Sequence, residues 1–180
     1  MKLDELKELY LHRQSCRAFS KREVPEELID EICALALLAP SACNAQPWKL
    51  VAVKGERAKQ VAKGLQDLGM NKFVSDAPVL IAVVEGKSNL SARAGTRLKD
   101  NDFLHNDIGI LVGHLVLAAE AAGLGSCILG WRNEKTLRTA LGLDEKAKIP
   151  EVVAIGYPEE GYPVREKKRK PLEETYVFLK

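Results

Sequence analysis

Apolar residues recur at helical spacing in three stretches of the chain. Residues 3–12 alternate charged and apolar positions with the period of an amphipathic helix. A second helix is predicted from Pro25, which suits a first helical turn, and it should end before Pro40 because proline cannot continue it. Its inward side chains are expected to be Leu28, Ile29, Ile32, Leu35 and Ala36. The longest helix is predicted over residues 104–122, which are apolar on nearly all sides and should pack on several faces.

Short apolar runs between these helices predict four strands. The runs cover residues 49–53, 78–84, 126–129 and 152–156. Helices are also predicted over 56–68 and 133–141. The segment 86–103 shows no clear period, so it is predicted as a loop and is a candidate mobile cover. The chain therefore mixes helices and strands, without internal repeats or low-complexity stretches.

Size and charge narrow the class of protein. The 180 residues suffice for one compact domain over 1–180 with a sizeable core. A formal net charge of +2 gives no general attraction to nucleic acid or to an anionic membrane. The first fifteen residues lack the continuous apolar core of a signal peptide, and no later run is long enough to span a bilayer. We therefore expect a cytoplasmic protein that binds neither nucleic acid nor membrane.

Four cysteines, Cys16, Cys33, Cys43 and Cys127, stand far apart in the sequence. They form no C-x-x-C pair and have no neighbouring histidine at metal-ligand spacing. The sequence thus predicts no metal site, and the cysteines are expected to be buried thiols.

Two basic clusters are candidate anion sites. The stretch "RQSCRAF", residues 13–19, places two arginines around a serine, and guanidinium and hydroxyl groups together suit a phosphate monoester. The alternative is an ordinary solvated helix end. The run "REKKRKPLEE", residues 165–174, is typical of a solvated face, and no aromatic residue interleaves it to stack on bases. It can still supply further cations to the same phosphate.

Two further stretches resemble connectors at first sight. In "AAGLGSCILGW", residues 121–131, Gly123 and Gly125 follow a helix and precede a strand, which is the reverse of a dinucleotide-binding turn. They are predicted to end the long helix and to allow close backbone approach to a flat group. In "APSACNAQPWKL", residues 39–50, two prolines enclose small polar residues, and these residues alone leave open whether the stretch is a connector or a site.

Together and in order, these stretches resemble the FMN-dependent nitroreductase family. The resemblance runs through "RQSCRAF", "APSACNAQPWKLVAV", "AAGLGSCILGW", "VVAIGYP" and "KKRKPLEE". It implies an α+β fold with a central, mainly antiparallel sheet flanked by helices. It also implies an intertwined homodimer with two FMN sites at the interface. Residues 165–180 would then form a C-terminal extension that packs on the partner subunit, where "ETYVFLK" adds an edge strand.

The resemblance assigns flavin contacts to particular positions of this chain. One end of the cofactor, its phosphate and ribityl chain, would be held by Arg13, Ser15, Arg17, Lys167 and Arg169. Leu129 and Gly130 would face the reactive nitrogen of the ring with their backbone, and many relatives have an acidic residue at the first of these positions. Asn71 is a further candidate contact. The partner subunit would contribute Pro40, Ser41, Ala42 and Asn44, and the last of these has both amide donors and an acceptor for a ring edge.

The implied activity follows from these contacts. NADH or NADPH would reduce FMN, and an electron-poor small molecule such as a nitroaromatic or a quinone would then be reduced at the same place. No catalytic side chain and no metal are required. Two alternatives stay open: another reaction on the same fold, namely reductive dehalogenation or flavin fragmentation, and a flavin-binding protein without catalysis.

Overall fold

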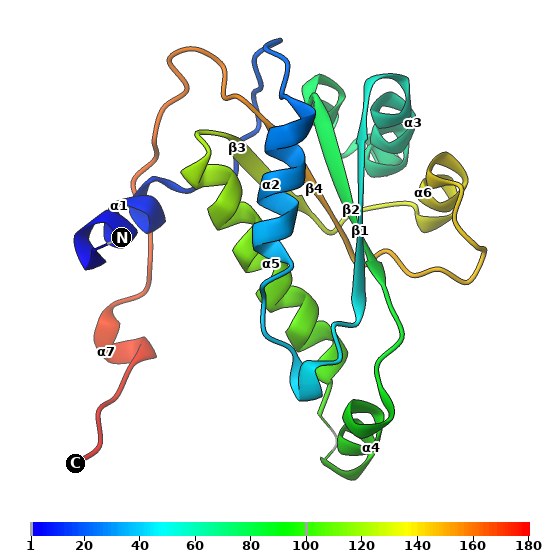
Figure 1. Cartoon of the computed structure of the whole chain (residues 1–180). Helices are drawn as coiled ribbons and strands as arrows, with labels where there is room; N and C mark the ends of the chain where they lie inside the picture. The colour runs from blue at the N-terminus through cyan, green and yellow to red at the C-terminus, as the bar shows by residue number, and fades with distance from the viewer. Residues whose placement is uncertain (1, 100) are drawn as a thin grey trace.

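Four antiparallel strands form one open sheet at the centre of the molecule, in the order β1-β2-β4-β3 (Figure 1). The computed structural model describes residues 2–99 and 101–180. The strands are β1 (Trp48–Lys54), β2 (Val79–Glu85), β3 (Gly125–Leu129) and β4 (Glu151–Gly156). Each ends within one residue of its prediction. β1 and β3 are the two edges of the sheet.

The described part of the chain contains seven helices. They are α1 (Leu3–His12), α2 (Glu26–Ala36), α3 (Gly55–Leu65), α4 (Leu90–Lys99), α5 (Phe103–Ala121), α6 (Glu134–Leu141) and α7 (Leu172–Thr175). The predictions for α1, α2, α3, α5 and α6 are confirmed, although α3 ends three residues earlier than predicted and a 3₁₀ turn, Asp67–Gly69, follows it. Further 3₁₀ turns span Ala42–Asn44 and Lys72–Asp76.

The prediction of a loop over 86–103 is wrong, because this segment contains α4. Leu90 and Leu98 are 81% and 80% exposed while the small Ala92 is 3% exposed, so the large apolar residues of this helix do not mark its inward face. The Asn89 side chain starts the helix by accepting a hydrogen bond from the Ala92 backbone amide at 2.9 Å.

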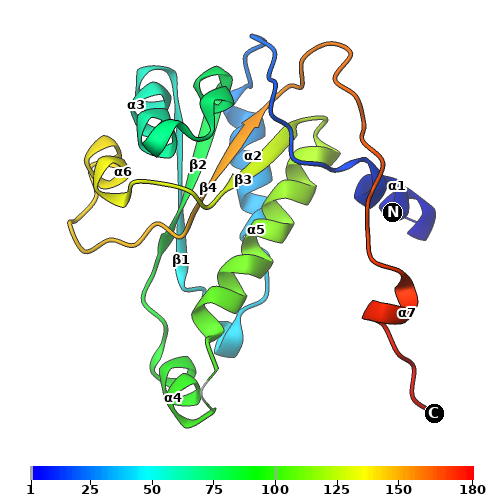
Figure 2. The ribbon, with the colours of Figure 1, turned by 180° about the vertical axis from the view of Figure 1, so that it is seen from behind.

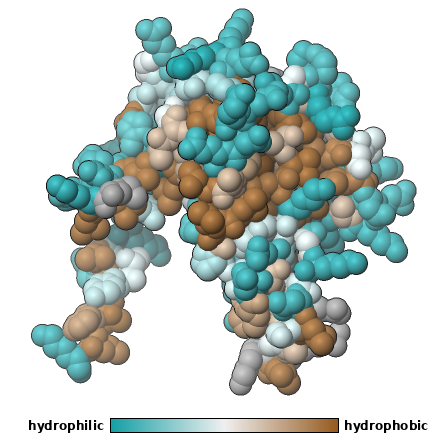
Figure 3. Space-filling view, viewed as in Figure 1, coloured by the Kyte–Doolittle hydropathy of each residue, from teal (hydrophilic) through white to brown (hydrophobic). Residues whose placement is uncertain are grey.

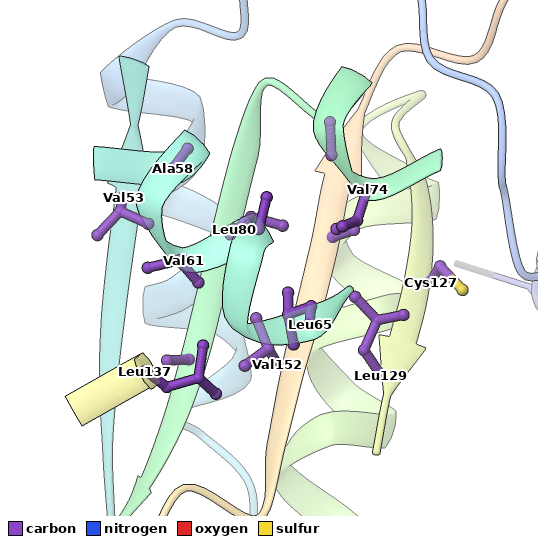
Figure 4. Packing of buried hydrophobic residues seen from close by; sticks show 14 of the residues in the cluster. Val53, Ala58, Val61, Leu65, Val74, Leu80, Cys127, Leu129, Leu137 and Val152 are labelled. Carbon is purple, nitrogen blue, oxygen red and sulfur yellow. The ribbon is translucent and has the colours of Figure 1, made fainter. Parts of the chain in front are cut away.

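The core lies in two layers, one on each face of the sheet. Side chains of β2 alternate between the layers, so Leu80 faces α3 and α6 while Ile81 faces α2 and α5. Figure 4 shows the first layer, where Leu65 of α3 and Leu137 of α6 pack near Val152 of β4. Because both faces are covered, all six residues from Val79 to Val84 are buried.

Two packing predictions need correction. Leu35 was expected to point inward but is 48% exposed, because α2 packs through Ile29, Ile32 and Ala36. The long helix α5 buries much of its surface against neighbours, yet Ile110 is 41% exposed, so one apolar face is left open within this chain.

Of the two glycines after α5, Gly123 has the predicted role, whereas Gly125 lies against the Cys16 side chain and not against a flat group. Gly123, with φ of +72°, ends the helix, and the Leu124 amide then donates to the Ala119 carbonyl at 2.9 Å. Gly125 permits a close approach, since a Cβ atom there would lie 2.7 Å from the Cys16 Cβ.

The C-terminal segment leaves the body of the protein. Residues 165–180 run beside α1 and then away from the sheet, and all of them except Lys167 are exposed (Figures 1 and 2). Within residues 2–99 and 101–180, no helix combines the length and apolar character needed to cross a membrane.

Candidate flavin site

A cationic basin lies where the end of α1 meets the C-terminal segment. It is an open cavity of ≈ 560 Å³ built from two stretches that are about 150 residues apart in the sequence. Its lining residues are Arg13, Gln14, Ser15, Arg17, Arg165, Glu166, Lys167, Lys168 and Arg169. The structure thus brings together all five residues predicted for a phosphate: Arg13, Ser15, Arg17, Lys167 and Arg169.

Hydrogen bonds fix these two stretches to each other. The Arg165 guanidinium donates to the Ser15 carbonyl at 2.5 Å and to the Gln14 side chain at 3.0 Å. The Lys167 ammonium donates to the Arg13 carbonyl at 2.7 Å. Backbone carbonyls of the first stretch therefore hold the cations of the second.

The basin concentrates positive charge. Six of its residues are cationic and one, Glu166, is acidic. Partial burial, followed by the nearby charges of Arg13 and Arg169, lowers the pKa of Lys167 below its ordinary 10.5. Because the positive charges of the basin repel one another, a bound anion would reduce this repulsion.

The edge strand β3 begins at this basin. The Cys16 amide donates to the Ser126 carbonyl at 2.8 Å, so the outer edge of the strand is occupied there. Backbone groups alternate sides along a strand, so Ile128, and Gly130 directly after the strand, share the outward direction of Ser126. From Ser126 to Gly130 the chain advances roughly 13 Å.

The far end of β3 carries the other predicted ring contacts. The side chain of Leu129 is 3% exposed and packs in the core layer of α3, and its backbone, one residue out of phase with Ser126, is directed at β4, where it pairs with Val152. Gly130 is exposed. Asn71, with φ of 49°, donates to the Leu65 carbonyl at 3.1 Å and to the Trp131 carbonyl at 3.5 Å. The structure therefore places Asn71 beside the turn that contains Gly130.

The loop 39–47 has a defined conformation. Cys43, Asn44 and Gln46 all have positive φ, between 45° and 51°. The Gln46 amide donates to the Ser41 hydroxyl at 2.9 Å, and the Gln46 side chain donates to the Asn44 side chain at 3.1 Å. These bonds explain the run of small polar residues between the two prolines.

A buried carboxylate anchors this loop to α5. Asp107 is 4% exposed, and its two oxygens accept from the Ala42 amide at 3.0 and 3.2 Å. The Asn89 side chain, which also caps α4, donates to the Cys43 carbonyl at 2.9 Å.

The loop and the basin lie at opposite ends of α5 (Figure 1). Asp107 belongs to the start of the helix, and Glu120, near its end, contacts His12 beside the basin. Thirteen residues of helix separate them, which is about 20 Å. Within one chain, Pro40, Ser41, Ala42 and Asn44 are therefore not brought to the basin.

Several residues that shape this site were not predicted. Asp107 could have been noticed as a carboxylate near the start of an otherwise apolar helix. Gln14 and Arg165 lie inside the quoted basic clusters, but nothing in the sequence pairs them. Tyr162, whose hydroxyl accepts from the Arg17 amide at 3.0 Å, carries no sequence signal at all.

The cysteines are not all buried as predicted, because Cys43 lies on the exposed loop. Cys16 and Cys127 are buried, and burial raises the pKa of both thiols. Burial also raises the pKa of Cys33 to about 11. Among the described residues, no group of three or more His, Cys, Asp or Glu side chains could hold a metal ion.

Comparison with known proteins shows the family of this chain and agrees with its fold. Residues 10–157 match the Nitroreductase family. A protein of Thermus thermophilus named NADH dehydrogenase is 34% identical, and the match covers 93% of each chain. Iodotyrosine deiodinase 1 of Rattus norvegicus is 28% identical over 99% of this chain and 71% of its own. The solved FMN-dependent nitroreductase NfnB of Mycobacterium smegmatis superimposes with a TM-score of 0.79 at 23% identity, covering 99% of this chain and 100% of that one.

The fold and the match define the class of this protein as an α+β oxidoreductase with an antiparallel sheet. The chain belongs to the nitroreductase family.

Proposed function

We propose that this protein passes a hydride from NADH or NADPH, through bound FMN, to an electron-poor small molecule such as a nitroaromatic or a quinone. It is an NAD(P)H-dependent FMN oxidoreductase of the nitroreductase type. The proposal places it in the cytoplasm, where reduced nicotinamides are available, and gives it no nucleic-acid partner.

The observation that carries this proposal is the cationic basin at the start of an open strand edge. A phosphate dianion fits a basin with six cations, and Arg13, Ser15, Arg17, Lys167 and Arg169 would hold it. The rest of FMN would lie along the outer edge of β3 beyond Ser126, which has no neighbouring strand among the residues that the structure describes. The residues present therefore fit the cofactor.

The reactive end would lie at Gly130. When bound, FMN supplies the hydride transfer that links the nicotinamide to the acceptor. The outward-facing backbone of Gly130, next to Leu129, would provide a hydrogen bond at this end without a side-chain acid. Asn71, held against the same turn, is proposed to contact the ring edge.

Two observations favour a homodimer with one flavin site at each end of the interface. The loop 39–47 lies about 20 Å along α5 from the basin, so one flavin that meets both would take them from two chains. Apolar side chains also gather on the exposed face of α2 and α5 (Figure 3). In such a dimer the partner's loop, through Pro40, Ser41, Ala42 and Asn44, would cover the ring and exclude water.

The tail gives a second reason to expect a partner chain. Residues Tyr176 to Leu179 are between 58% and 84% exposed, although three of the four are strongly apolar. We propose that residues 165–180 pack on the partner, where 174–180 pair with an edge strand, while 1–180 remains one domain.

The first test is spectroscopic. Purified protein should be yellow, bind FMN, and bleach when NADH or NADPH is added without oxygen. Protein that takes up no FMN would overturn the proposal, and protein that binds FMN but is not bleached by either nicotinamide would favour a non-catalytic flavin carrier.

The second test addresses the shared site. Arg17→Ala and Asn44→Ala chains are unfolded and refolded together and assayed at an FMN concentration low enough that each homodimer alone is nearly inactive. Random exchange makes about half of the dimers mixed, and half of their sites are intact, so activity should recover to about a quarter of wild type. If both residues served one site from the same chain, mixing could rebuild no site, and verified heterodimers would stay as inactive as their parents.

A second activity is favoured by one comparison. Relatives named iodotyrosine deiodinase match nearly the whole chain, so reductive dehalogenation is the alternative reaction. Anaerobic turnover of an iodinated phenol, with release of iodide and no nitroaromatic reduction, would select it.

A further inference from the structure

The turn after β3 is held from both sides. On the α3 side, the Trp131 indole donates to the Asp67 carbonyl at 2.9 Å and the Asn133 amide donates to the Gly64 carbonyl at 2.7 Å. On the other side, Leu129 pairs with Val152, which brings Gly130 opposite Glu151 at the start of β4. The peptide of Gly130 is thus part of a tightly fixed turn.

Arg132 acts directly on that peptide. Its guanidinium donates through Nη1 to the Gly130 carbonyl at 2.5 Å and through Nη2 to Glu134 at 3.0 Å. Glu134 in turn accepts from Arg138 at 3.0 Å. A chain of charge-assisted hydrogen bonds therefore runs from Gly130 into α6.

The contacts around Arg132 leave some buried polar atoms unpaired, which lowers the stability of the fold. Among the residues that the structure describes, the Arg132 Nε and one oxygen of Glu151 are buried and have no hydrogen-bond partner. Burial raises the pKa of Glu151, while the facing charge of Arg132 lowers it. Unpartnered buried polar atoms cost free energy, and those that persist in a native structure call for an explanation.

We propose that Arg132 is a positioning residue for the flavin reaction, which fixes the Gly130 peptide and holds a positive charge at the reactive end of the site. This inference rests on the proposed FMN site. A fixed cation stabilises the negative charge that a flavin gains on reduction, so Arg132 should raise the reduction potential of bound FMN. Glu151 faces the same guanidinium, and its negative charge should lower the reduction potential of bound FMN.

The chain offers a matched control. Arg138 is bonded to the same Glu134, and the side chains of both arginines are 23% exposed. Only Arg132 contacts Gly130, because the second partner of Arg138 is the Ala147 carbonyl at 3.1 Å. Loss of either arginine removes one charge from the network, but only one of them lies at the reactive end.

The experiment measures the midpoint potential of FMN bound to each variant by anaerobic titration with reference dyes. Arg132→Gln should weaken binding of reduced relative to oxidised FMN on the order of tenfold. For a two-electron couple this is a fall of about 30 mV. Arg138→Gln should leave the potential unchanged, and Arg132→Lys, which keeps the charge, should lie nearer wild type than Arg132→Gln does.

Glu151→Gln supplies a test that leaves the arginine intact. Measured at pH 8.5, it should raise the potential, because it removes the negative charge that faces Arg132. Equal potentials for wild type, Arg132→Gln and Glu151→Gln would overturn this inference and leave the proposed function standing. Wild-type protein that binds no FMN would overturn both.

Discussion

Replacement of Asp107 by alanine tests how the loop 39–47 is held. The carboxylate is 4% exposed and accepts from the Ala42 amide with both oxygens, at 3.0 and 3.2 Å. Hydrogen bonds to charged groups contribute about 1.5–3 kcal/mol, and Asp107→Ala also leaves the Ala42 amide without its acceptor. We therefore expect the free energy of unfolding to fall by about 2 kcal/mol. Asp107→Asn keeps one acceptor oxygen and should lose about half as much.

Two measurements check this expectation. Urea denaturation without FMN gives the loss of stability, and fluorescence of Trp48, which directly follows the loop and is 9% exposed, is a suitable probe. FMN titration then reports the loop's function, since a loop without its anchor should cover the partner's site less well and weaken FMN binding. If Asp107→Ala unfolded at the same urea concentration as wild type and bound FMN equally well, the carboxylate would not anchor the loop.

Two further predictions concern charge. Arg17→Ala should weaken FMN binding by about 1.5 kcal/mol and leave riboflavin binding unaffected. The value is at the low end for charged hydrogen bonds because this side chain is exposed. Equal weakening of FMN and riboflavin binding would contradict the phosphate assignment. Because burial raises the pKa of Glu151 above its ordinary 4.5, the stability contributed by its protonated form is full below pH 4.5 and is lost as pH rises through the raised pKa. In urea denaturation, the stability of Glu151→Gln relative to wild type should therefore increase from pH 4 to pH 8. A difference in stability that stays constant over this range would show that burial does not raise the pKa of Glu151.

The sheet could be predicted from the sequence because both of its faces are buried. In a domain of this size, a short continuous apolar run such as 79–84 fits best as a strand that is covered on both faces. The helix α4 could not be predicted by the same method, since its leucines face solvent and nothing imposes an apolar period on it. Leu35 was misplaced for a related reason: the width of the apolar stripe on α2 does not reveal which part of it meets α5.

The site was predictable only in pieces. The arginines and the serine of 13–17 suggested an anion, but the bond between Arg165 and the Ser15 carbonyl depends on how the C-terminal segment returns to α1. The resemblance to a known family joined the two basic clusters through Lys167 and Arg169, but it did not assign Arg165. Neither the sequence pattern nor the family resemblance indicated Asp107. A buried acceptor is recognised by its hydrogen-bond partner, here the Ala42 amide, and not by its spacing in the sequence.

The cationic side chains of the basin have two different roles. Arg165 and Lys167 direct hydrogen bonds at the carbonyls of Ser15 and Arg13, and so join the two ends of the chain. The Arg17 backbone is fixed by the Tyr162 hydroxyl while its side chain stays exposed, which leaves its guanidinium available for a ligand. Since the same C-terminal segment is proposed to reach the partner subunit, an anion in the basin would stabilise the contact between the two chains as well as the binding of the cofactor.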